Sequence, residues 1–275
     1  MTDTLKTFYT SYADKITEKR LESPYAVRRF AHEKQYAAVL RYIEPGMRVL
    51  DAGCGEGVLS IMMAQKGAFV VGTDLSEPNI LAAKRFAQDK NVTVEFQLAD
   101  AEKLPFPDNS FDIVVSSHVL EHLTDFDQGL REVMRVTKKR AVVAIPTILN
   151  LCSFVQVGHG WFYLKGLRSY LALPYGMLRT VYALITGKEG VDEGYVGTDM
   201  PHIFRFPYIL KQKARRMGFS VVEYRASSIC IPYFESFLWI GIFLDTYSTR
   251  RILRNFGYGT TYVLEKEVTN DSVSI

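Results

Sequence analysis

The chain has 275 residues, of which 48% are hydrophobic and 23% charged, and its formal net charge is +3. This composition is typical of a globular protein of one or two domains and excludes disordered and collagen-like classes. We expect neither a secretory signal after Met1 nor a membrane-spanning segment, because no apolar run is long and charge-poor enough. The cysteines (Cys54, Cys152, Cys230) show no paired spacing, which indicates a reduced, cytoplasmic protein.

The charge is unevenly distributed along the chain. Residues 133–188 contain eight basic residues and no acidic one, so this stretch carries +8 and the rest of the chain carries −5. Such a split favours an anionic partner or a membrane surface for the basic stretch.

The periodicity of apolar residues predicts alternating strands and helices. Helices are predicted at 26–43, 58–65, 77–88, 123–136 and 207–217, and strands at 48–50, 68–72, 92–97, 111–116, 141–145, 219–224 and 259–264. Ser76 is the predicted N-cap of the third helix, with Pro78 in its first turn. Short buried strands that alternate with helices indicate an α/β fold with a doubly wound, mostly parallel, seven-stranded sheet.

The alternation also predicts how the single domain, 1–275, is organised. A helical cover (1–44) precedes a core (45–146), and a cap insertion (147–200) follows the fifth strand. Residues 201–275 return to the sheet and contain a second apolar insertion. We expect no strand–helix unit within the cap insertion, because its aromatic and basic residues and a following Gly/Asp loop interrupt the pattern.

A glycine-rich turn is the sharpest local motif. Residues 49–57 read Val-Leu-Asp-Ala-Gly-Cys-Gly-Glu-Gly at the end of the first strand. Glycines permit positive φ and let a ligand approach the backbone near a helix N-terminus. The spacing differs from the G-x-G-x-x-G of dinucleotide sites, and the carboxylate of Asp51 suits an ammonium or sulfonium group better than a phosphate.

Further polar residues follow the next three strands. Asp74 ends the second strand and can accept hydrogen bonds from both hydroxyls of a ribose. Asp100 follows the third strand and can bind an adenine amino group, while the small Ala101 leaves room for the ring. Residues 116–123, Ser-Ser-His-Val-Leu-Glu-His-Leu, end the fourth strand in the same crevice.

Together these four motifs resemble the class I S-adenosylmethionine-dependent methyltransferases over residues 47–146. The resemblance implies a Rossmann-like fold, S-adenosylmethionine as cofactor and no metal. It implies that the glycine turn holds the methionine part, Asp74 the ribose, and Asp100 with Ala101 the adenine. The cofactor-binding residues expected are Asp51, Gly53, Cys54, Gly55, Gly57, Asp74, Leu75, Asp100, Ala101, Ser117 and His118.

Two histidines are candidates for a catalytic base. Methyl transfer from a sulfonium needs a base only when the acceptor is a hydroxyl or a protonated amine. His118 faces the crevice by register and is either this base or a contact to the cofactor. His202 lies where similar methyltransferases place a substrate-facing residue. His122 is interpreted as structural, and Glu121 as either a substrate ligand or a helix cap.

The segment 151–187 is aromatic, basic and free of acidic residues, and Met177, Leu178, Val181, Tyr182 and Ile185 form one helical stripe. Three interpretations stay open: a lid over the substrate, a lid that also touches a membrane, and an oligomer interface. The ubiquinone-biosynthesis O-methyltransferases are similar in having an apolar segment at this point.

The sequence therefore predicts methyl transfer from S-adenosylmethionine to the O or N of an apolar small molecule or lipid-like acceptor. One alternative is a sensor or scaffold that binds S-adenosylmethionine without transferring the methyl group. Another is an RNA methyltransferase, but nucleic acid is a less suitable partner because the cations are diluted by aliphatic residues.

Overall fold

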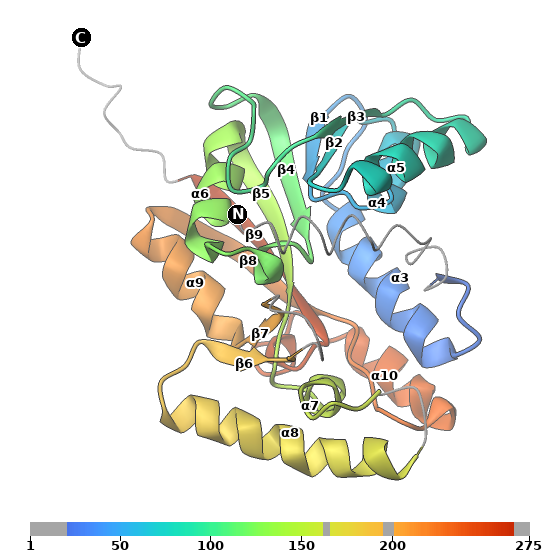
Figure 1. Cartoon of the computed structure of the whole chain (residues 1–275), viewed down its shortest axis with the longest axis vertical. Helices are drawn as coiled ribbons and strands as arrows, with labels where there is room; N and C mark the ends of the chain where they lie inside the picture. The colour runs from blue at the N-terminus through green and yellow to red at the C-terminus, as the bar shows by residue number, and fades with distance from the viewer. Residues whose placement is uncertain (1–20, 162–165, 195–200, 267–275) are drawn as a thin grey trace.

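In the computed structural model, which describes residues 21–161, 166–194 and 201–266, a seven-stranded sheet forms the centre of the molecule (Figure 1). Its strands are β1 (Arg48–Ala52), β2 (Phe69–Asp74), β3 (Glu95–Leu98), β4 (Phe111–Ser117), β5 (Thr137–Pro146), β8 (Phe219–Ser227) and β9 (Gly259–Lys266). The strand order is β3-β2-β1-β4-β5-β9-β8, and β9 pairs antiparallel with both of its neighbours while the other pairs are parallel. The predicted doubly wound, mostly parallel sheet is thus confirmed.

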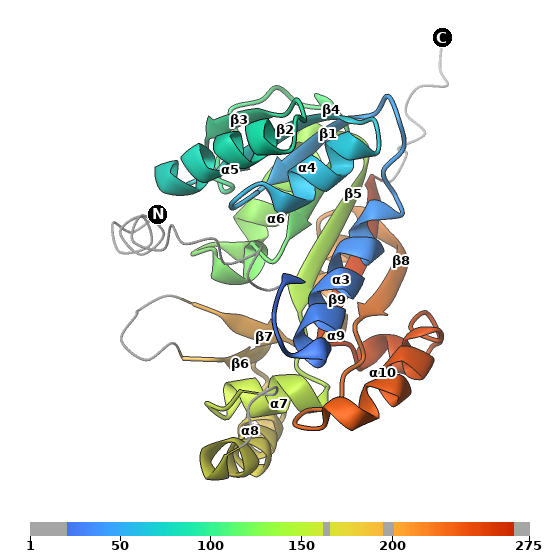
Figure 2. The same cartoon turned by 90° about the vertical axis from the view of Figure 1, so that its right-hand side faces the viewer.

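Helices cover both faces of this sheet (Figures 1 and 2). One layer contains α3 (Ala26–Leu40), α4 (Val58–Gln65) and α5 (Glu77–Asp89), and the other contains α6 (Phe126–Val136) and α9 (Pro207–Arg216). The central strands are buried on both faces, which explains why they read as continuous apolar runs rather than as an alternating pattern.

Local signals set most helix boundaries. Ser76 caps α5, since its hydroxyl accepts a hydrogen bond of 3.3 Å from the backbone N–H of Asn79. The helix predicted from residue 123 begins only at Phe126, where Asp125 is the N-cap. The reason is that Leu120–His122 (η1) forms a separate 3₁₀ turn and residue 123 is extended.

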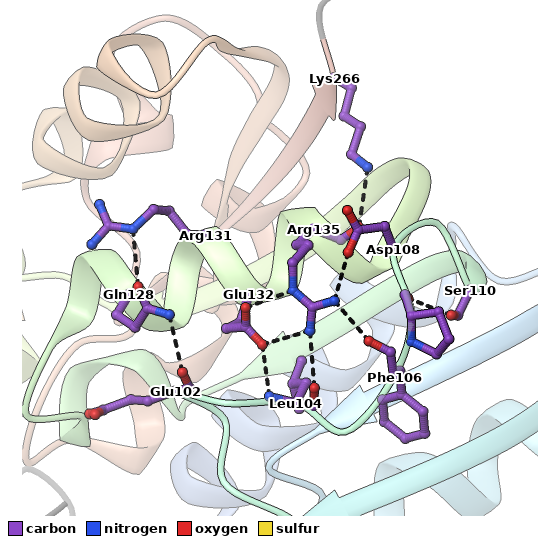
Figure 3. Close-up of polar contacts among 11 residues, drawn as sticks. Glu102, Leu104, Phe106, Asp108, Ser110, Gln128, Arg131, Glu132, Arg135 and Lys266 are labelled. Atoms are coloured by element: carbon purple, nitrogen blue, oxygen red, sulfur yellow. Dashed lines mark hydrogen bonds and ion pairs between the residues drawn. The ribbon is translucent and has the colours of Figure 1, made fainter.

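A half-buried arginine, Arg135, fixes the loop between β3 and β4 to α6 (Figure 3). The guanidinium of Arg135 donates to the carboxylates of Glu132 and Asp108 and to the carbonyls of Leu104 and Phe106, all at 2.7–3.0 Å. Such bidentate contacts are the stronger kind of charged hydrogen bond. They hold rigid the loop that carries Asp100 and Ala101.

The inserted segments gather at one end of the molecule (Figures 1 and 2). They comprise α7 (Leu151–Val157), α8 (Leu167–Ile185), β6 (Gly190–Asp192), β7 (Ile203–Arg205), η2 (Glu235–Phe237), α10 (Leu238–Asp245) and η3 (Leu253–Asn255). Part of the predicted helical cover (1–20) and parts of the cap insertion (162–165 and 195–200) lie outside the described residues. Among the described residues, no helix is long and apolar enough to cross a membrane.

The cap insertion contains a short strand, β6, that the periodic pattern did not indicate. β6 forms a two-stranded antiparallel sheet with β7. A side chain at Gly190 would approach within 2.2 Å of the Phe204 carbonyl, so the glycine permits this pairing. Strands of three residues are too short to give a periodic signal in the sequence.

Candidate active site

The glycine turn follows β1 and is tightly packed at Gly53 and Gly57 but open at Gly55. Gly53, Gly55 and Gly57 all have positive φ, at 84°, 53° and 78°. A Cβ on Gly53 would lie 2.3 Å from a methyl carbon of Val119, whereas a Cβ on Gly55 would meet nothing within 4 Å. The turn therefore presses against the segment after β4 and leaves its outer side at Gly55 open to a ligand.

The carboxylate of Asp74 ties the end of β2 to this turn. It accepts hydrogen bonds from the backbone N–H groups of Gly55 at 2.8 Å and Ser76 at 2.9 Å, and from the side-chain amide of Asn79 at 3.3 Å. Burial raises the pKa of Asp74, and these hydrogen bonds oppose the rise. Because it is held from both sides, the carboxylate has a fixed orientation beside the open face of the turn.

Asp51, just before the turn, is only 2% exposed. Its carboxylate accepts a hydrogen bond of 2.6 Å from the hydroxyl of Ser60 in α4. Burial, assisted by the nearby charge of Asp74 and opposed by Ser60, raises the pKa of Asp51 to about 7. A positively charged ligand at this edge would stabilise the ionised form.

The remaining predicted cofactor residues lie at the same edge of the sheet. Parallel register aligns Asp74 with Leu98 and Asp51 with Val115, so the ends of β1 to β4 lie side by side. Asp100 and Ala101 follow β3, and the carboxylate of Asp100 accepts the backbone N–H of Glu102 at 2.8 Å. Cys54 lies in the glycine turn, Leu75 follows β2 and Ser117 ends β4.

His118 follows β4 with a strained backbone. Its φ is +57°, which is uncommon for a residue with a side chain, and its N–H donates to the Ala144 carbonyl at 2.8 Å. The Nδ1 atom lies 3.2 Å from Oε1 of Glu121, whose side chain is fully buried. Burial alone would raise the pKa of Glu121, but the hydrogen bond with His118 opposes it and the pKa stays low. The ionised carboxylate thus orients the imidazole.

The second predicted base, His202, lies near the same carboxylate. Its ring stacks on His122 with centroids 4.6 Å apart, and its Nδ1 pairs with the carboxylate of Glu193. Nδ1 of His122 lies 3.3 Å from the Pro201 carbonyl, and burial lowers the pKa of His122 to about 4. The structure thus brings both predicted catalytic histidines to one buried cluster around Glu121.

Part of this cluster has the composition of a metal-binding group. Glu121, His122 and His202 each offer one donor atom, and these atoms lie within 4.8 Å of one another. Nitrogen and oxygen donors of this kind suit zinc and similar divalent cations. The sequence predicts no metal here, and local spacing could not have revealed the group because His202 comes from a distant segment.

This fold, with a glycine turn and buried acidic groups at its switch point, is the Rossmann-like fold of the class I S-adenosylmethionine-dependent methyltransferases. Residues 50–145 match the family model of the methyltransferase domain. Ubiquinone biosynthesis O-methyltransferase of Mesorhizobium japonicum is 38% identical over 103 residues, which are 38% of this chain and 41% of that protein. The matched segment thus spans less than half of the length of this curated relative.

Two solved structures share the fold over most of the chain. Magnesium protoporphyrin IX methyltransferase of Synechocystis PCC 6803, with bound SAH, has a TM-score of 0.56 at 19% identity, covering 95% of this chain and 100% of that chain. The [4+2]-cyclase SpnF has a TM-score of 0.55 at 19% identity, covering 87% and 82%. At these identities, the comparison supports the fold and leaves the reaction to be argued from the site.

Proposed function

We propose that this protein transfers the methyl group of S-adenosylmethionine to an oxygen or nitrogen atom of an apolar small molecule or lipid-like acceptor. The observation that carries the proposal is that three carboxyl groups, Asp51, Asp74 and Asp100, lie at the ends of neighbouring strands, at the sheet edge that carries the glycine turn. They match the ammonium, the ribose hydroxyls and the adenine amino group of the cofactor. The match with ubiquinone biosynthesis O-methyltransferases supports a small-molecule acceptor.

S-adenosylmethionine supplies a methyl group that its sulfonium already activates. The chain's own residues then have to hold the acceptor in line, exclude water and take one proton. For a hydroxyl acceptor, a new O–CH₃ bond replaces the S–CH₃ bond, and the hydroxyl proton passes to Nε2 of His118. Glu121 stabilises the imidazolium that forms, since its carboxylate lies beside Nδ1.

We further propose that the cap rests against an anionic lipid surface. The helix α8 faces α7 with small residues, and a Cβ on Gly176 would lie 1.8 Å from the Phe154 carbonyl. Its larger apolar side chains therefore point outward: Leu178 is 68% and Ile185 79% exposed. The predicted stripe thus faces away from the body of the protein, which favours a membrane over a lid that covers the substrate.

A second helix adds to this apolar surface. On α10, Trp239 is 65% and Phe243 57% exposed, and α10 lies at the same end of the molecule as α8 (Figures 1 and 2). Large contiguous apolar patches on the surface of soluble proteins mark interaction sites. The absence of acidic residues from 133 to 188 suits an anionic bilayer surface.

The proposed activity is tested by incubating the protein with S-adenosylmethionine and an organic extract of cells, and measuring formation of S-adenosylhomocysteine. We expect both compounds to bind in calorimetry and the extract to accelerate conversion. Binding without extract-dependent conversion would support a sensor or scaffold instead. Conversion only with an RNA fraction would favour an RNA methyltransferase.

A further inference from the structure

Three polar side chains from separate elements converge on Gly259, the first residue of β9. A Cβ at Gly259 would lie 3.2 Å from Oγ of Ser227, 3.4 Å from Nε2 of Gln35 and 3.4 Å from Cε1 of His118. Ser227 ends β8, Gln35 lies in α3, and His118 follows β4. We call this group, Gln35, His118, Ser227 and Gly259, the polar notch.

The polar atoms of the notch are buried without hydrogen-bond partners among the described residues. This holds for Nε2 of Gln35, Nε2 of His118 and Oγ of Ser227. Gln35 is 5% and Ser227 1% exposed. A buried polar group that stays unsatisfied is destabilising, so three of them at one place indicate that a ligand completes them.

The orientations of two of these groups are set by their other contacts. Oε1 of Gln35 lies 3.1 Å from Nδ1 of His32, which directs the amide nitrogen to the opposite side. Nδ1 of His118 faces Glu121 at 3.2 Å, so a proton on Nδ1 leaves Nε2 as an acceptor. The notch therefore offers an N–H donor, an imidazole acceptor and a hydroxyl that can do either.

The notch lies next to the cofactor edge. Val119, the residue after His118, is the side chain that a Cβ on Gly53 would strike. His118 thus lies between the glycine turn and the polar notch, and the residue with the strained, positive φ is the one at this junction. A group bound in the notch would lie on the acceptor side of the site.

We infer that the polar notch binds the hydroxyl group of the methyl acceptor. This inference rests on the proposed methyl transfer and specifies it as O-methylation of a neutral hydroxyl compound. A hydroxyl both donates and accepts, so it can donate to Nε2 of His118 while it accepts from Gln35. A carboxylate is disfavoured because it cannot donate a hydrogen bond to the acceptor nitrogen of His118. An ammonium is disfavoured because it cannot accept one from the N–H of Gln35.

The inference is tested with phenol as a probe and toluene as its counterpart without a hydroxyl, on protein saturated with S-adenosylhomocysteine. The chain has only five histidines, so ¹H–¹³C correlation spectra of the imidazoles report on His118, assigned by His118→Gln. We expect phenol to shift the His118 signal and to bind at least about tenfold more tightly than toluene.

Variants of the notch should remove this preference. Gln35→Leu and Ser227→Ala should each reduce the phenol-to-toluene ratio several-fold, and Gly259→Ala should abolish the His118 shift because its methyl fills the notch. Tyr42→Phe, beyond the other end of α3, is the control and should leave the ratio unchanged. Calorimetry with S-adenosylhomocysteine checks that each variant is folded.

Two results would overturn the inference: equal affinities for phenol and toluene, or a phenol preference that survives both Gln35→Leu and Ser227→Ala. Either result with intact S-adenosylhomocysteine binding would refute the notch alone. If wild-type protein bound no S-adenosylhomocysteine, the proposed function would fail, and the notch assignment with it.

Discussion

The cofactor core (45–146) and the cap (147–200 with α10) use their side chains in opposite ways. In the core, polar groups such as Asp51 and Asp74 are buried and bonded at the ends of strands, and apolar residues fill the interior. In the cap, small residues pack inward and large apolar ones such as Ile185 lie outside. This difference supports the proposals that the core holds a charged small ligand and that the cap meets an apolar surface.

The basic stretch, residues 133–188, is shared between these two regions. Three of its cations belong to β5, and two of these are paired: Lys138 contacts Asp112 at 2.6 Å, and Arg140 pairs with Glu265 of β9. In the cap, Arg179 donates to backbone carbonyls of residues 157 and 192. Part of the charge of +8 therefore lies in and beside the sheet, and the rest lies in the cap.

The largest expected effect is loss of cofactor binding in Asp74→Ala. The substitution removes the hydrogen bond from Gly55 in the glycine turn, the one from Ser76 after β2, and the proposed ribose contact as well. We expect the Kd for S-adenosylhomocysteine, measured by calorimetry, to rise at least about 100-fold. The control is Asp112, whose carboxylate lies away from this edge and is bonded to Lys138 and Arg48. Asp112→Ala should change the Kd for S-adenosylhomocysteine less than about threefold. Equal effects of both variants would contradict the assignment.

The next effect concerns the boundary between the two regions. In His118→Gln the proposed base is lost, so extract-dependent formation of S-adenosylhomocysteine should slow by about 100-fold or more. The affinity for S-adenosylhomocysteine should stay within about threefold. His159→Gln, in the cap, is the matched control with full activity. An unchanged rate in His118→Gln would show that the protein uses no base at this position.

The proposed membrane contact of the cap is tested by placing a negative charge on the outer face of α8. Leu178→Asp should weaken flotation with vesicles containing roughly a third anionic lipid by about tenfold, because the aspartate opposes both burial and surface charge. Leu81→Asp places the same change on an exposed position of α5 and should leave flotation unchanged. Wild-type protein that does not float with these vesicles would refute the membrane proposal.

The smallest effect is a proton released on cofactor binding. The pKa of Asp51 is raised to about 7, so about half of these groups are protonated at pH 7. An ammonium ligand favours the ionised form, so binding should release about half a proton and tighten about twofold between pH 7 and pH 8. Calorimetry in buffers of different ionisation enthalpy measures this number. In Asp51→Asn, cofactor binding should release no proton from this position. A release equal to that of the wild-type protein would contradict the proposed contact between Asp51 and the ammonium group.

The sequence predicted the core well because local patterns determine it. Continuous apolar runs marked the strands, and the turn around Gly53 and Gly55 carried its own signal. The cap could be located but not oriented, since the pattern of α8 does not show that the side with Gly176 faces inward. Glu121 and His202, like Gln35 and Ser227, are brought together only by tertiary packing, so no spacing in the sequence could indicate those groups.

The central claim is that the acidic core delivers a methyl group to an apolar acceptor. Its most direct test is to incubate the protein with a cell extract and either S-adenosylmethionine or its trideuteromethyl form, and to compare products by mass spectrometry. The account predicts an organic-extractable product that carries the deuterated methyl group with wild-type protein and is missing with Asp74→Ala. No labelled product, or label only in RNA, would contradict it.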